Sequence, residues 1–104
     1  MSDALIIYIT CKDDGQAESI ATAVVEARLA ACANIIPGMR SIYHWESKIE
    51  SAQEVVLLLK TQAAHFDACA ALVRQMHSYE VPCIVALPIV KGTTDFLEWL
   101  KEQA

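Results

Sequence analysis

The chain has 104 residues, of which 55% are apolar, and a formal net charge of −5. This length suits one domain, and the apolar fraction exceeds the ~45–50% of ordinary soluble domains. The basic residues are scattered, which excludes a nucleic acid or an anionic membrane as the expected ligand, because phosphate binding is largely electrostatic. The composition therefore predicts an acidic domain whose surplus of apolar side chains is covered by a partner, most simply copies of the same chain.

The sequence also predicts a cytoplasmic location. Asp3 stands where a secretory signal has positive charge, and the apolar run after it is short. No segment approaches the ~18 apolar residues of a membrane-spanning helix. The cysteines show no paired spacing of the zinc-binding kind, and we interpret all of them as reduced thiols. They are Cys11, Cys32, Cys69 and Cys83.

The first half of the chain predicts a strand, a helix and a long bent strand. Residues 5–12 are β-branched and apolar on both faces, which indicates a buried strand. Asp14 is the expected N-cap of a helix that runs to about Ala31. Residues 32–50 read as one long strand with a bend at Pro37 and Gly38, the residues that interrupt strands.

The second half predicts a hairpin, a helix, a strand and a terminal helix. Residues 54–61 form the strand after the hairpin, and their five consecutive apolar residues demand burial on both faces. Because an antiparallel sheet normally leaves one face in water, this run favours an oligomer. A helix is expected over residues 63–77 and a strand over 83–91. Thr94 or Asp95 would N-cap the last helix.

This element order predicts the fold class. A β-α-β-β-α-β order with crossovers of the usual hand gives an α+β, ferredoxin-like sandwich, here with an extra C-terminal helix. Many functions share this fold, so function has to come from particular residues.

The stretch "HSYEVPC", residues 77–83, concentrates side chains that could carry chemistry. As a metal site, His77 and Cys83 would bind copper or zinc, with a third ligand from Glu80, Cys11 or a neighbouring subunit. In the enzyme interpretation, His77 would activate Cys83 or Cys11 as a nucleophile. The sequence shows no glycine-rich nest to supply the oxyanion donor, so an enzyme is the least favoured class. As a plain turn, His77 would end a helix and Pro82 would begin a strand.

Several segments resemble the CutA-type divalent-cation tolerance family over nearly the whole chain. They are "EARLAACANIIPGMRSIYHWESKIE", "EVVLLLKT", "HSYEVP" and "ALPIVKG". The resemblance implies one CutA-like domain over residues 1–104, assembled as a homotrimer that binds copper or other divalent ions. It implies no organic cofactor and no enzymatic reaction. The alternative is a trimeric small-molecule sensor whose ligand lies in clefts between subunits.

The resemblance also assigns candidate residues. The family's histidine corresponds to His77 and its tyrosine to Tyr79. The aromatic pair of the long strand corresponds to Tyr43 and Trp45. The residues expected to line a ligand cleft are Tyr43, Trp45, Lys60, Tyr79 and Glu80.

Three positions depart from the family pattern. Ser78 stands where the family usually has proline, and Ser47 stands where a glycine is expected after "WE". Cys83 replaces a glutamate that is a candidate cation ligand. One hypothesis is a softer site of His77, Cys83 and Cys11, because a thiolate favours Cu(I) or Zn(II) over harder cations. The opposite hypothesis is that losing the carboxylate destroyed the site.

Overall fold

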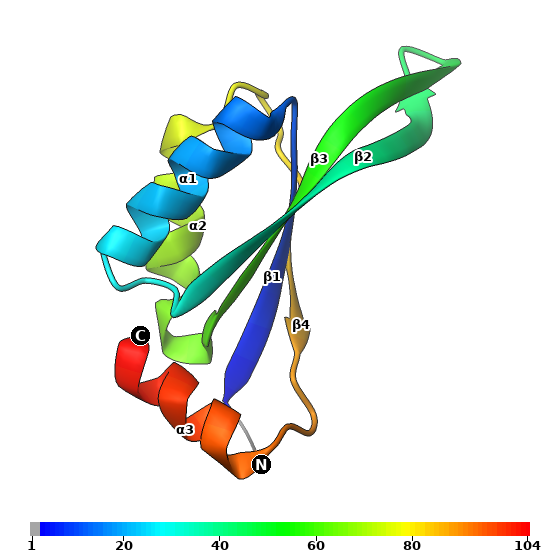
Figure 1. The fold of residues 1–104 in the computed structure, drawn as a ribbon. Helices are drawn as coiled ribbons and strands as arrows, with labels where there is room; N and C mark the ends of the chain where they lie inside the picture. Colours follow the sequence, from blue (N-terminus) through cyan, green and yellow to red (C-terminus); the bar gives the residue numbers. More distant parts are fainter. Residues whose placement is uncertain (1–2) are drawn as a thin grey trace.

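The structure is a computed structural model, and it describes residues 3–104. Its elements in chain order are β1 (Ala4–Cys11), α1 (Asp14–Glu26), β2 (Cys32–Trp45), β3 (Lys48–Gln62), a 3-10 turn (Ala63–His65), α2 (Phe66–Met76), β4 (Ile84–Pro88) and α3 (Thr94–Gln103). The strands form one antiparallel sheet in the order β2-β3-β1-β4. Helices α1 and α2 lie side by side on one face, and α3 lies beyond one end of the sheet (Figure 1). The α+β, ferredoxin-like prediction is confirmed.

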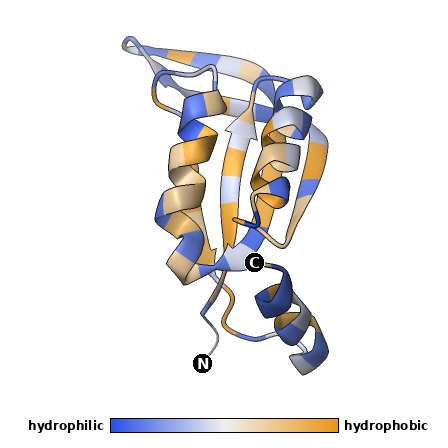
Figure 2. Cartoon of the chain, turned by 90° about the vertical axis from the view of Figure 1, so that its left-hand side faces the viewer, coloured by the Kyte–Doolittle hydropathy of each residue, from blue (hydrophilic) through white to orange (hydrophobic). Residues whose placement is uncertain are grey.

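The hydrophobic core lies between the sheet and the helix pair. Ile7 and Ile9 of β1 are fully buried, because β1 is a central strand and their side chains face the helices. Helix α1 contributes Ala17, Ile20, Ala21 and Val24, and α2 contributes Cys69 and Val73. Figure 2 shows the apolar central strands behind the two helices. The core therefore fixes both helices against the same face, which brings the start of α1 and the end of α2 to one end of β1.

Helix α1 differs from its predicted limits at both ends. Its N-cap is Asp13 rather than Asp14, and the Asp13 carboxylate accepts a 2.8 Å hydrogen bond from the Gln16 N–H. The helix ends at Glu26 rather than near Ala31, because Arg28 has a φ of 57° and so leaves the right-handed helical region.

The second helix and the last strand are shorter than the sequence predicts, whereas β3, expected over residues 54–61, is longer. The expected helix over 63–77 is a 3-10 turn followed by α2, and the expected strand over 83–91 is limited to Ile84–Pro88. The N-cap of α3 is Thr93, rather than Thr94 or Asp95. The Asp95 carboxylate instead accepts a hydrogen bond from the Phe96 N–H.

Most of the apolar run of β3 is buried within the chain. Strand β3 lies between β2 and β1, and Leu57 and Leu59 face the helices. On the opposite face Val56 is only 8% exposed. Leu58, on the same face as Val56, is only partly buried, so the expectation that a second copy covers this face stays a prediction. Large exposed apolar side chains of the sheet lie on the β2–β3 hairpin and on β4, and include Ile42, Trp45, Ile49, Val85 and Leu87.

Strands β2 and β3 extend beyond the rest of the sheet as a two-stranded ribbon (Figure 1), which we call the hairpin arm, residues 39–53. It begins at a register shift between Ile36 and Met39, where the sequence predicts the bend. It ends in a tight turn whose central residues, Glu46 and Ser47, have φ values of 49° and 65°. A two-residue hairpin turn of this kind needs positive φ at both positions, and glycine is preferred at the second.

Candidate functional site

His77 lies at the end of α2 and makes two hydrogen bonds that fix its ring. It is the C-cap of the helix, and it is 9% exposed. Its Nε2 lies 2.8 Å from the carbonyl oxygen of Thr10, and its Nδ1 lies 3.1 Å from the backbone nitrogen of Tyr79. A carbonyl only accepts and an amide N–H only donates. Nε2 therefore carries the proton, and the Nδ1 lone pair accepts from Tyr79.

Tyr79 connects this histidine to a buried carboxylate on β3. Its phenol donates a 2.8 Å hydrogen bond to Oε2 of Glu54, which is 9% exposed. The His77 and Tyr79 rings also pack together, with their centroids 4.7 Å apart. Burial, followed by the hydrogen bond to Glu54 and the charge of that carboxylate, raises the pKa of Tyr79 to about 12. The phenol is therefore a fixed hydrogen-bond donor at physiological pH.

Cys11, the last residue of β1, lies beside these groups. Its side chain is fully buried. Burial, with smaller effects from the Glu54 and Asp13 carboxylates, raises the pKa of the thiol to about 11. The thiolate, which is the nucleophilic and metal-binding form, is thus disfavoured at neutral pH in this arrangement.

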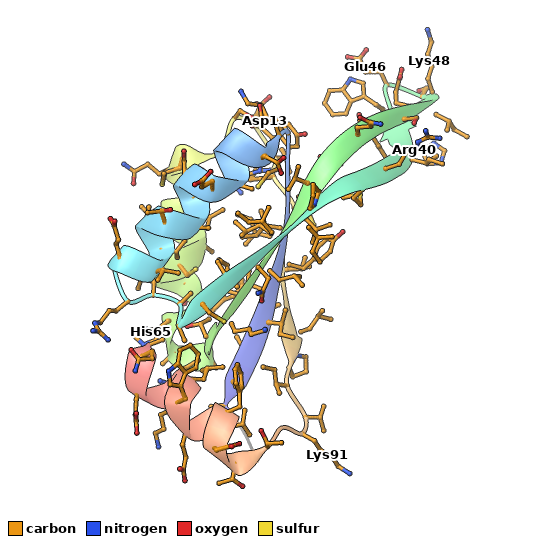
Figure 3. The ribbon with its side chains drawn as sticks, viewed as in Figure 1. Asp13, Arg40, Glu46, Lys48, His65 and Lys91 are labelled. Carbon is orange, nitrogen blue, oxygen red and sulfur yellow. The ribbon has the colours of Figure 1, made fainter. Side chains whose placement is uncertain are left out.

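The loop that carries these residues, which we call the His77 loop (residues 77–82), is tied to three elements. Ser78 Oγ accepts a 2.8 Å hydrogen bond from Gln16 Nε2 on α1. The Gln16 Oε1 accepts in turn from the backbone N–H of Lys12 at 3.0 Å. With His77 bound to β1 and Tyr79 bound to β3, the loop is held closed. Figure 3 shows Asp13 at the start of α1, next to this end of β1.

Cys83 lies apart from Cys11. It comes one residue before β4 and its side chain is exposed. The next residue, Ile84, pairs with Ile9 and packs against the core. Side chains alternate along a strand, which places Cys83 on the open face of the sheet while Cys11 lies on the helix-covered face.

The predicted metal set of His77, Cys83 and Cys11 is therefore not gathered within one chain. His77 and Cys11 lie at the same end of the sheet, but Cys83 is turned away from both. Among residues 3–104, no group of three or more histidine, cysteine, aspartate or glutamate side chains could hold a metal ion. A site built from this set needs either a movement of the chain or a ligand from a second copy.

The residues expected to line a ligand cleft also do not converge. Tyr43 lies close enough to Tyr79 to contribute to its raised pKa. Trp45 lies near the tip of the hairpin arm and is 61% exposed. Lys60 lies toward the opposite end of β3, with Nζ 5.6 Å from the centroid of the Phe96 ring. Glu80 is exposed, and its carbonyl oxygen is 3.5 Å from Arg74 Nη2.

A cavity of about 620 Å³ lies elsewhere in the described part of the chain, between α3 and the start of β1. Its apolar lining includes Ala4, Val90, Leu97 and Leu100. None of the residues expected to line a ligand cleft contributes to it. This cavity is therefore not the ligand cleft that the sequence predicts.

Glu54 is the site residue that sequence reasoning missed. It begins the apolar run "EVVLLL" and was interpreted only as the start of a strand. A glutamate at the start of an apolar strand is itself a signal of a polar contact, because a carboxylate that enters a buried strand requires a hydrogen-bond donor. The donor, Tyr79, is 25 residues away in sequence, and only the fold shows the pairing.

Comparison with known proteins places the chain in a family. A family model described as "CutA1 divalent ion tolerance protein" matches residues 5–103. The chain is 40% identical to the divalent-cation tolerance protein CutA of Pectobacterium atrosepticum over 96% of its own length and 91% of that protein. It is 44% identical to the human protein CutA over 91% of its own length, but it spans only 53% of that longer protein.

The solved structures agree with these relatives. The divalent cation tolerance protein of Thermus thermophilus superposes with a TM-score of 0.94 at 44% identity, covering 96% of this chain and 97% of that one. A relative from Arabidopsis thaliana is described as chloroplastic and one from Archaeoglobus fulgidus as periplasmic. In the described part of this chain, no helix is long and apolar enough to cross a membrane.

The names of these relatives describe tolerance of divalent cations and name no enzymatic reaction. The family match runs through every strand and helix of the ferredoxin-like fold, and the His77 loop lies inside it. This chain belongs to the CutA1 family of divalent ion tolerance proteins.

Proposed function

We propose that the protein is a single-domain, cytoplasmic, homotrimeric cation-tolerance protein that binds copper, zinc or another divalent ion and contributes to the response to metals. The cluster of His77, Cys11 and Glu54 carries this proposal. Imidazole, thiol and carboxylate are donor types that transition metals use, and these three residues lie at one end of the sheet. Because the described residues of one chain form no group of three that could hold an ion, the proposal includes a ligand from a second copy. The proposal includes no enzymatic activity.

Exposed apolar surface supports the homotrimer. Ile42 and Ile49 on the hairpin arm are each 71% exposed. An isolated two-stranded hairpin is marginally stable in water, so an arm of this length is expected to pack against something. Within the described chain, β2 and β4 are also the edge strands of the sheet. Copies of the same chain offer matching edges and apolar faces.

Assembly also offers a source for the missing ligand. Cys83 is exposed at the start of the edge strand β4, where a neighbouring copy would pack. We propose that Cys83 of one subunit approaches the His77 end of the next, which would complete a set of His77, Cys11 and Cys83 across the interface. Such a set is softer than one containing a carboxylate and favours Cu(I) or Zn(II).

The test is a titration of Cu(I) and Zn(II) into the reduced protein beside His77→Ala and Cys83→Ser. His65→Ala and Cys32→Ser are matched controls outside the cluster. We expect stoichiometric binding by the parent and both controls, and its loss in both test variants. Equal binding by the parent and His77→Ala would remove His77 from the site. Loss in His77→Ala with retention in Cys83→Ser would leave His77 as a ligand and remove Cys83.

A second candidate function is a trimeric sensor of small molecules. Tyr43 lies on the outer half of the arm, opposite Glu50, and is close enough to Tyr79 to contribute to its raised pKa; both Tyr43 and Trp45 are exposed. Aromatic side chains of this kind line pockets for organic ligands. A metal-free protein whose Trp45 fluorescence responds to an organic metabolite, and not to copper or zinc, would favour this candidate.

A further inference from the structure

We infer that the cavity between α3 and the start of β1 binds a small zwitterion with an aliphatic body, the chemistry of a free aliphatic amino acid or a short apolar peptide. This inference goes beyond the proposed function and does not depend on it. The cavity is lined by Ala4 at the start of β1, whereas His77 contacts Thr10 near the end of that strand.

The floor of the cavity is apolar. Leu100 of α3 is 1% exposed and Ala4 of β1 is 6% exposed, and both line the cavity together with the partly buried Leu97. The volume of about 620 Å³ falls within the ~300–1,000 Å³ of small-molecule sites. Among the described residues no aromatic side chain contributes to the lining, so the floor suits an aliphatic group better than a stacked ring.

The walls of the cavity are held in place by contacts within the chain. A Cβ added to Gly92 would meet the Leu97 side chain at 3.1 Å, so the segment before α3 packs tightly against the helix. Near the other end of α3, the side-chain amide of Gln62 donates to the carbonyl oxygens of Lys101 and Ala104. A ligand therefore finds a preformed site, which lowers the entropic cost of binding.

One face of α3 presents both signs of charge to the cavity. Its lining residues are spaced at i, i+3, i+4 and i+7, and they are Thr94, Leu97, Glu98 and Lys101. Opposite charges three residues apart can pair on a helix, yet in residues 3–104 no ion pair engages Glu98 or Lys101. Figure 3 shows Lys91 pointing away from α3, so Lys101 supplies the positive charge on this wall.

A ligand that carries both charges matches this wall. Its ammonium group would bind Glu98, with Asp3 as a second carboxylate in the lining, and its carboxylate would bind Lys101. A ligand with only a carboxylate would face Glu98 and Asp3, and a ligand with only an amine would face Lys101. Each of these meets a like charge, so the cavity favours a zwitterion whose aliphatic body lies on Leu97 and Leu100.

The experiment titrates L-leucine and L-leucyl-L-leucine separately into the metal-free protein and follows backbone ¹⁵N–¹H spectra. We expect saturable shifts of the amide signals of Ala4, Gly92 and Thr94. Isocaproate, which is leucine without its amino group, and isopentylamine, which is leucine without its carboxyl group, should bind about tenfold more weakly than leucine, because each loses one charge-assisted hydrogen bond. Tighter binding of leucine would identify a free amino acid as the ligand, and tighter binding of the dipeptide a peptide.

Two variants assign the charges. Glu98→Gln should weaken leucine binding about tenfold without weakening that of isocaproate, and Lys101→Gln should weaken leucine binding about tenfold without weakening that of isopentylamine. Glu102→Gln, at an exposed position of α3 outside the cavity lining, and Lys48→Gln, on the hairpin arm, are the matched controls and should bind leucine as the parent does.

Three results would overturn the inference. They are the absence of saturable shifts with both probes, shifts confined to residues outside the cavity, and binding of isocaproate or isopentylamine as tight as that of leucine. Because the probes are added without metal, none of these results bears on the metal titration of His77→Ala and Cys83→Ser.

Discussion

His77, Tyr79 and Glu54 show how each buried polar residue requires the next. Glu54 lies at the entrance of the buried part of β3, and the Tyr79 phenol is the donor that the structure gives it. Tyr79 is positioned in turn because its own N–H binds the His77 ring. The three residues come from β3, from the His77 loop and from the end of α2, so the contacts couple elements that are distant in sequence.

Removing the phenol should therefore destabilise the fold. In Tyr79→Phe, the nearly buried Glu54 carboxylate loses its donor, and the expected loss is about 1–3 kcal/mol in the free energy of unfolding. Urea unfolding followed by circular dichroism measures it. Tyr8→Phe is the matched control, with an expected change within about 0.5 kcal/mol. An equal effect of the two substitutions would show that the Tyr79–Glu54 hydrogen bond adds nothing measurable to the free energy of unfolding.

Stability should fall at alkaline pH. The pKa values of Cys11 and Cys69 are raised to about 11 by burial, and that of Tyr79 to about 12. In each case the folded pKa lies above the unfolded value, so the stabilisation is complete below the unfolded pKa and is lost as pH rises through the folded one. The free energy of unfolding should decline from about pH 9 to about pH 12.

Cys69→Ala isolates one contribution to this decline. Its free energy of unfolding should fall less steeply than that of the parent between about pH 9 and pH 11, the range set by the buried thiol. Cys83→Ala, at an exposed position, should keep the slope of the parent. Parallel curves for the parent and Cys69→Ala would contradict the raised pKa of Cys69.

Among the elements, the hairpin arm shows what the sequence could and could not predict. Pro37 and Gly38 interrupt an otherwise strand-like run, and the register shift lies where they predicted it.

The predicted limits of α1 were wrong because Ala27, Leu29 and Ala30 suit a helix, whereas Arg28 takes a positive φ in the fold. The burial of Val56 agrees with the predicted burial of this run on both faces, but the strands that cover it, β2 and β1, could not be identified from the run itself.

The candidate site was only partly predictable for a related reason. His77 and Tyr79 are conspicuous in a short stretch, so sequence reasoning selected them. Glu54 and the carbonyl of Thr10 acquire their roles only when β1 and β3 are brought to the end of α2. A local pattern can name a histidine, but it cannot show that both ring nitrogens already have partners.

Ser47 gives a direct test of the turn at the tip of the arm. Its φ of 65° lies in the left-handed region, where glycine has no steric cost. Ser47→Gly should therefore raise the free energy of unfolding by about 0.5–1 kcal/mol, after the added entropy of the unfolded chain is counted. Thermal unfolding monitored by circular dichroism measures the change.

Gly38→Ala provides the opposite control for that experiment. Gly38 has a φ of 78°, and an added Cβ would meet nothing within 4 Å. Any loss of stability therefore reports backbone strain rather than a clash, and about 1 kcal/mol is expected. If both substitutions left stability unchanged, positive φ would carry no measurable cost in this ribbon.

The shape of the whole molecule points to assembly. The chain measures 45 × 25 × 23 Å, and the arm accounts for much of the long axis (Figure 1). Figure 3 shows Arg40, Glu46 and Lys48 on the arm, away from α1 and α3. A projecting ribbon whose side chains include Ile42, Trp45 and Ile49 leaves apolar surface in water that the core of one chain cannot reach.

Light scattering tests this expectation directly. At micromolar concentration we expect a mass of three times 11.4 kDa for the parent. Replacing both Ile42 and Ile49 by glutamate should reduce the mass toward that of one chain, because burying two unpaired charges in an apolar interface is costly. Trp45 fluorescence should shift to longer wavelength at the same time, as its side chain becomes hydrated.

The control places the same charge where no interface is expected. Thr22→Glu lies on the exposed face of α1 and should leave the mass of the parent unchanged. A parent that scatters as a single chain would reject the homotrimer and, with it, a metal set completed by Cys83 of a neighbour. A trimeric double variant would show that Ile42 and Ile49 do not carry the interface, and the next side chains to replace would be Val85 and Leu87 on the edge strand β4, which are also exposed.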